Sequence, residues 1–129
     1  MIRSTFVIAL FVLKTLALTC QEIDSAWVVQ NYTKTETFIE MRDGVKLFTT
    51  IYAPKDNGEK HPVLMMRTPY SVAPYGKDKF SPRLYITHWK NYLAGNYIMV
   101  MQDVRGKYMS EGKFEDVRPF NPDKKKKDT

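Results

Sequence analysis

The sequence is poor in the residues that mark common cofactor and metal sites. Its 129 residues include one cysteine, six glycines and two histidines. A single cysteine, Cys20, excludes an internal disulfide and a cysteine-based metal site. The sequence also lacks a dinucleotide or phosphate-binding glycine loop, a paired-histidine zinc helix and a Gly-x-Ser-x-Gly nucleophile turn. We therefore expect no metal and no cofactor, and these residues alone cannot complete a nucleophilic mechanism.

Positive charge is concentrated at the two ends of the chain, although the net charge is +6. The first twenty residues contain Arg3 and Lys14 and no acid, and the last eight contain Lys124–Lys127 against Asp123 and Asp128. Between the ends, 14 basic residues accompany 12 acidic ones. The body is therefore nearly neutral and has no electrostatic footprint for a phosphate backbone. We expect no nucleic-acid partner, and a nucleic-acid binder based on the C-terminal lysines has little support.

The N-terminus lacks an apolar run long enough to span a membrane. A short basic start precedes residues 6–18, which are apolar except for Lys14 and Thr15. This pattern is typical of a signal peptide over residues 1–20 and predicts export to the periplasm or the cell exterior. Cleavage could follow Thr19 or Cys20. Lipid attachment at Cys20 and a buried N-terminal helix or strand are the less favoured alternatives.

The next segments predict a β-hairpin. Residues 21–35 are mostly polar, and we expect a leader segment that packs on the outside of a domain. Residues 37–41 and 45–52 are rich in β-branched and aromatic residues and flank the turn sequence Arg42–Gly44. Glycine after aspartate favours the positive φ that a tight hairpin turn needs.

A strand–helix–strand pattern follows. Residues 63–67 and 97–102 are continuously apolar, which is typical of strands covered on both faces. Residues 82–93 between them predict one helix that ends at Gly95. Its apolar face would carry Leu84, Tyr85, His88, Trp89 and Tyr92. The order predicts a right-handed crossover with parallel strands, and hence an α/β fold with an antiparallel edge.

Candidate site residues follow the two parallel strands, because ligands of α/β sheets bind beyond the carboxyl ends of the strands. Arg67–Tyr70 follows the first strand and Asp103–Gly106 the second. The Tyr70 phenol could donate a hydrogen bond to a developing oxyanion, or the ring could cap the core. Asp103 and Arg105 could form an ion pair that pins the loop or could contact substrate, and Arg67 could serve either purpose.

Three motifs, in order along the chain, resemble a known family. They are Glu40–Leu47, Arg67–Tyr70 and Gln102–Gly112. Together they cover about residues 36–121 and are similar to the S15 family, the Xaa-Pro dipeptidyl-peptidase-like hydrolases. This group includes cocaine esterase, glutaryl-cephalosporin acylase and α-amino acid ester hydrolase enzymes.

The resemblance implies an α/β-hydrolase domain that cleaves an ester or amide of a small molecule or short peptide through an acyl-enzyme. It implies that Tyr70 donates to the oxyanion hole, and that residues 36–129 form an incomplete domain ending before the nucleophile strand. The Ser, Asp and His of the triad would lie further on, so this chain alone should be inactive. Many members carry a carboxylate directly after the tyrosine, where this chain has Ser71 and Val72, so a preference for substrates with a free α-amino group is not implied. The alternative is a small exported binding protein without chemistry.

Overall fold

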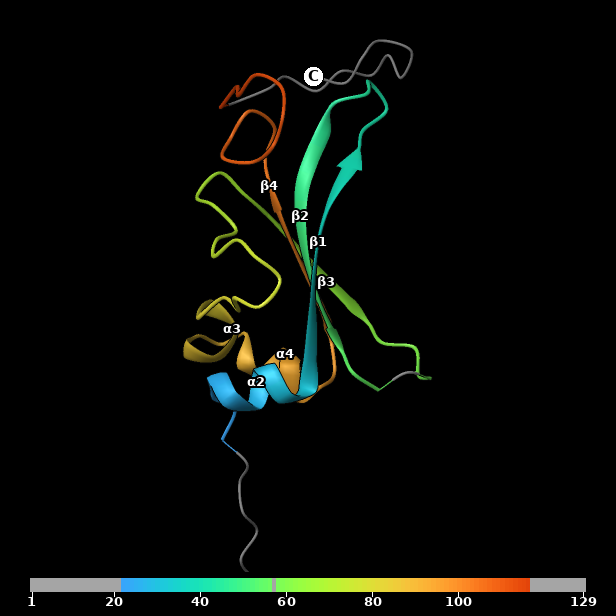
Figure 1. Cartoon of the computed structure of the whole chain (residues 1–129), viewed down its shortest axis with the longest axis vertical. Coiled ribbons are helices and arrows are strands. Elements are labelled where there is room, and N and C mark those ends of the chain that lie inside the picture. Colours follow the sequence, from blue (N-terminus) through green and yellow to red (C-terminus); the bar gives the residue numbers. More distant parts are fainter. Residues whose placement is uncertain (1–21, 57, 117–129) are drawn as a thin grey trace, which may run out of the picture.

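A mixed four-stranded sheet is the main element of the computed structural model, which describes residues 22–56 and 58–116. The strand order is β1-β2-β4-β3, and among the described residues three short helices lie along one face of the sheet (Figure 1). The predicted signal peptide and the lysine-rich C-terminus fall outside the described residues. In the described part of the chain, no helix is long and apolar enough to cross a bilayer.

The predicted hairpin is confirmed and is longer than expected. Strands β1 (Tyr32–Glu40) and β2 (Lys46–Pro54) pair antiparallel over their full length. The turn places Gly44 at a φ of 82°, and the Gly44 amide donates to the Met41 carbonyl over 2.9 Å. The expected antiparallel edge of the sheet is therefore present.

The segment expected to be a leader is integral to the fold. Helix α2 (Ser25–Asn31) begins after Asp24, whose carboxylate accepts the Trp27 amide over 2.8 Å. The helix leads directly into β1, which starts at Tyr32 rather than near residue 37. This early start follows from alternation, because Tyr32 and Lys34 both point to the buried face.

The parallel pair is confirmed, and the single crossover helix is wrong. Strands β3 (Val63–Thr68) and β4 (Ile98–Asp103) are parallel neighbours. Between them lie α3 (Arg83–Ile86) and α4 (Lys90–Ala94). The break falls at Thr87, which is extended and whose hydroxyl donates to the Arg83 carbonyl and accepts the Trp89 amide. Such side-chain bonds compete with helix continuation.

The broken helix buries a different set of residues from the one predicted. Leu84 and Trp89 are buried as expected, whereas His88 and Tyr92 are exposed and Leu93 is buried instead. Together with residues of the sheet, these side chains form one core. Its buried members are Val28, Tyr32, Phe48, Tyr52, Val72, Leu84, Trp89, Leu93, Met99 and Met101.

The expected burial of β3 on both faces is not found within the described residues. Leu64 and Met66 pack against the core under the helices, but Val63 is 60% exposed and Met65 is 50% exposed on the opposite face. In α/β proteins, an apolar parallel strand is normally covered on both faces by other elements of the fold.

Two core tyrosines predict a loss of stability at high pH. Burial, helped by the charge of Asp56, raises the pKa of Tyr32 to about 12, and burial likewise raises the pKa of Tyr52 to about 12. A tyrosine with a raised folded-state pKa contributes stability that is complete below its unfolded pKa of about 10. That stability is then lost as the pH rises towards 12.

We expect cooperative unfolding between pH 10 and about 12, measured by tyrosinate absorbance alongside circular dichroism. The Tyr52→Phe variant should lose less stability over this interval than the unmodified chain. Ionisation of every tyrosine near pH 10 with the fold intact would contradict the prediction.

Candidate functional site

The carboxyl ends of β3 and β4 bring the two predicted site segments together. Thr68 is the register partner of Asp103, and the Val104 amide donates to the Thr68 carbonyl over 3.1 Å. Tyr70 follows directly, with its amide bonded to the Thr68 hydroxyl over 3.0 Å. The Tyr70 side chain is 79% exposed, so it does not cap the core of the described residues. A phenol in this position is open to a ligand at the sheet edge.

Asp103 is a buried carboxylate that organises the loop after Tyr70. It accepts the Val72 amide over 2.9 Å and the Tyr75 hydroxyl over 3.3 Å. Burial raises the pKa of Asp103, while these hydrogen bonds act in the opposite direction. Val72 and Tyr75 both belong to the loop between β3 and α3, which makes Asp103 an anchor for that loop.

The predicted ion pair between Asp103 and Arg105 is wrong. Arg105 instead binds Asp43 in the hairpin turn through two contacts of 2.8 and 3.0 Å. The hydrogen bond from Arg105 lowers the pKa of Asp43. The chain leaves the sheet after Asp103, so the two side chains face different surroundings. Arg105 therefore holds the loop after β4 in place, but it does so by binding the β1–β2 turn rather than Asp103.

Ser71 sits in a backbone conformation that non-glycine residues rarely adopt, with a φ of 75°. Its hydroxyl lies 3.0 Å from the Tyr75 hydroxyl and accepts the Ala73 amide over 3.0 Å. These bonds hold the turn directly after Tyr70. In the sequence, Ser71 stands out only as a departure from the family pattern, and this contact could not be predicted from it.

The loop after β4 extends the sheet by side-chain contacts. The Ser110 hydroxyl accepts the Phe48 amide over 2.8 Å and donates to the Asp103 carbonyl over 2.7 Å. The Glu111 amide then donates to the Lys46 carbonyl, and the Glu111 carboxylate accepts the Lys46 backbone amide. The motif from Gln102 to Gly112 therefore closes the edge of β2 where β4 ends.

A cleft of about 660 Å³ lies between the hairpin turn and the ends of β3 and β4. Arg67 and Arg105 both line it, together with Asp43 and Glu115. Tyr70 is not among the lining residues, so the structure does not bring all predicted site residues into one cavity. Within the described residues, no group of three His, Cys, Asp or Glu side chains could hold a metal ion.

The mixed sheet, with its crossover and an exposed tyrosine at the strand ends, defines the N-terminal part of an α/β-hydrolase fold. The sequence pattern of the X-Pro dipeptidyl-peptidases (S15 family) matches residues 43–128. The chain belongs to this S15 family.

Three similar proteins show how much of a relative's length this chain matches. The cocaine esterase of Rhodococcus sp. (strain MB1 Bresler) is 38% identical over 76 residues, which are 59% of this chain and 12% of the esterase. An α-amino acid ester hydrolase structure is 38% identical, covering 84% of this chain and 18% of its own, with a TM-score of 0.59. An aminopeptidase from the marine sediment archaeon Thaumarchaeota archaeon is 34% identical, covering 78% of this chain and 17% of its own, with a TM-score of 0.56. The chain thus spans less than a fifth of these relatives.

Proposed function

We propose that this chain supplies the N-terminal part of an exported serine hydrolase that cleaves an ester or amide bond through an acyl-enzyme. The observation that carries the proposal is Tyr70, an exposed phenol at the carboxyl end of β3 in a chain of the S15 family. The names of the relatives, an esterase, an ester hydrolase and an aminopeptidase, support hydrolysis of ester and amide bonds. The substrate would be a small molecule or a short peptide.

In the proposed reaction, Tyr70 stabilises the oxyanion that forms when a nucleophile attacks the substrate carbonyl. A neutral hydroxyl held in place is a suitable donor, because it needs no reorganisation as negative charge develops. The Asp103 and Ser71 contacts fix the backbone on the carboxyl side of Tyr70, and the Thr68 hydroxyl fixes its amide. The serine, histidine and aspartate of the triad would come from the remainder of the hydrolase.

A chimera tests whether this segment can serve in a working hydrolase. Residues 22–116 replace the superposed segment of the α-amino acid ester hydrolase, whose structure covers 84% of this chain. We expect a folded chimera that hydrolyses an activated ester, because the segment carries the loop geometry that the oxyanion donor needs. Circular dichroism checks the fold, and the unmodified ester hydrolase is the reference for turnover. A folded chimera without turnover would argue against the proposal.

A further inference from the structure

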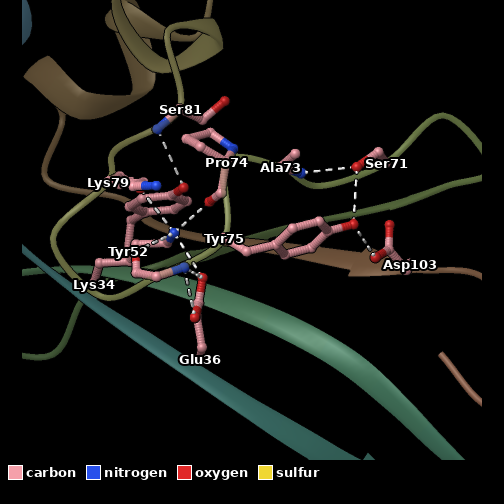
Figure 2. Close-up of polar contacts among 11 residues, drawn as sticks. Lys34, Glu36, Tyr52, Ser71, Ala73, Pro74, Tyr75, Lys79, Ser81 and Asp103 are labelled. Carbon is pink, nitrogen blue, oxygen red and sulfur yellow. Dashed lines mark hydrogen bonds and ion pairs between the residues drawn. The ribbon is translucent and has the colours of Figure 1, made fainter. Parts of the chain in front are cut away.

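The Lys34 ammonium is an enclosed charge on the buried face of the sheet. Lys34 lies on β1, and its side chain is fully buried. Figure 2 shows its nitrogen joined by dashed lines to Pro74, Lys79 and Glu36. The nitrogen donates to three backbone carbonyls at 2.6, 2.9 and 2.8 Å, those of Pro74, Gly76 and Lys79. A buried charge is tolerated only when it is paired and hydrogen-bonded in this way.

Glu36 completes the surroundings of the ammonium. One carboxylate oxygen lies 2.8 Å from the Lys34 nitrogen, and both oxygens accept the Gly76 amide, at 2.8 and 3.0 Å. The Tyr52 ring centroid lies 5.8 Å from the same nitrogen. The ammonium is thus surrounded by three carbonyls and a carboxylate, the same kinds of oxygen that a protein offers to a hard metal cation. We call Lys34, Glu36, Pro74, Gly76 and Lys79 the Lys34 cluster.

Tyr75 connects the Lys34 cluster to Ser71, which precedes Val72 and follows Tyr70 in the chain (Figure 2). Its backbone lies between Pro74 and Gly76, whose carbonyls both bind Lys34. Its ring packs edge-on against Phe48, with 5.4 Å between centroids. Its hydroxyl reaches Ser71, the residue next to Tyr70, and the buried carboxylate of Asp103.

We propose that Lys34 is a positioning residue, a fixed internal cation that holds the loop backbone and thereby sets the place of Tyr70 through Tyr75 and Ser71. All of its carbonyl partners lie in the loop, whereas β1 is joined to β2 by nine registered residue pairs. Loss of the ammonium should therefore loosen the loop and leave the hairpin intact. The proposal rests on the proposed function, because it assigns the loop the task of aiming the oxyanion donor.

Hydrogen exchange on the full 129-residue chain tests the loop without any catalysis. In Lys34→Ala, the Gly76 and Val72 amides should exchange about tenfold faster or more, since charged hydrogen bonds to the loop are lost. Amides of the β2–β4 ladder should keep their protection. Lys55→Met is the matched control, because Lys55 is exposed and donates to a single carbonyl, that of Val29. Unchanged exchange at Val72 would overturn the proposal, because that amide reports the Tyr70 end of the loop.

Chemical rescue separates the cation from the lost stem. n-Propylammonium carries the three carbons and the nitrogen that Lys34→Ala removes. We expect it to restore protection at Gly76 and Val72, whereas propanol and tetramethylammonium at equal concentration should not. Equal rescue by propanol would show that volume rather than charge holds the loop, and would overturn the proposal.

The complete hydrolase tests positioning itself. Lys34→Ala should lower kcat about tenfold or more with little change in KM, because a displaced donor weakens transition-state binding. Tyr75→Phe keeps the Lys34 cluster and removes only the linking hydroxyl, so it should lower kcat while the Gly76 amide stays protected; this variant decides the matter if Lys34→Ala fails to fold. An unchanged kcat in a variant with a loosened loop would overturn the positioning role. Absence of turnover with Lys34 intact would instead contradict the proposed function and leave the exchange result standing.

Discussion

Tyr70→Phe in the complete hydrolase should lower kcat about a hundredfold, equivalent to about 3 kcal/mol of transition-state stabilisation. The substitution keeps the ring and removes one hydroxyl. Because Tyr70 is 79% exposed, packing in the described residues should not change. KM should change little, because the hydrogen bond gains its strength as negative charge develops on the substrate oxygen. Steady-state kinetics on an activated ester measure both constants.

Tyr92→Phe is the control for the loss of a tyrosine hydroxyl. Tyr92 lies on α4, away from the carboxyl ends of the parallel strands, and is also partly exposed. Its kcat should stay within a few-fold of the unmodified enzyme. If Tyr70→Phe and Tyr92→Phe behave alike, Tyr70 has no part in oxyanion stabilisation.

Gly106→Ala should destabilise the protein by about 3 kcal/mol or more, because it combines backbone strain with a steric clash. Gly106 has a φ of 68°, and an added Cβ would lie 2.2 Å from the Phe114 amide nitrogen and 2.5 Å from the Lys113 carbonyl carbon. Both contacts are with backbone, which cannot move aside as a flexible side chain would. Chemical denaturation monitored by circular dichroism gives the free energy of unfolding.

Two other glycines separate the strain from the clash. Gly44 has a φ of 82° but open space around an added Cβ, so Gly44→Ala should cost about 1 kcal/mol. Gly58 has neither feature, and Gly58→Ala should stay within about 0.5 kcal/mol of the unmodified chain. If Gly106→Ala were tolerated as well as Gly58→Ala, the loop from Gln102 to Gly112 would not have the tight packing that the structure assigns to it.

The elements with local signals could be predicted from the sequence. The Asp43–Gly44 turn between two β-rich runs predicted the hairpin, and the two apolar runs around a helical segment predicted the parallel pair. The same strand pattern placed Tyr70 just beyond the carboxyl end of a parallel strand, as the structure does. These features depend on residues close together in the chain, where spacing and turn chemistry are informative.

The features missed from the sequence depend on contacts between distant residues. Lys34 binds carbonyls some forty residues away, and no local pattern in the polar stretch around it identifies those partners. An ion pair between Arg105 and its neighbour Asp103 was one of two expectations, the other being substrate contact, but its partner Asp43 lies 62 residues away. The break at Thr87 arises from side-chain hydrogen bonds that periodicity does not detect. The available signal was that Lys34 occupies an inward-facing position of an alternating strand. It was missed because the strand was predicted to start near residue 37, whereas β1 starts at Tyr32.

Burst kinetics on the complete hydrolase test the central claim most directly. The claim is that this chain is the N-terminal part of a serine hydrolase that forms an acyl-enzyme. With an activated ester, we expect a rapid burst of about one product per active site before the slower steady state, abolished by prior labelling with a serine-directed phosphonate. The 129-residue chain alone should show neither burst nor labelling, because the proposed function places the triad in the remainder of the hydrolase. Turnover by the 129-residue chain, or a complete protein that neither turns over esters nor reacts with the phosphonate, would contradict the account.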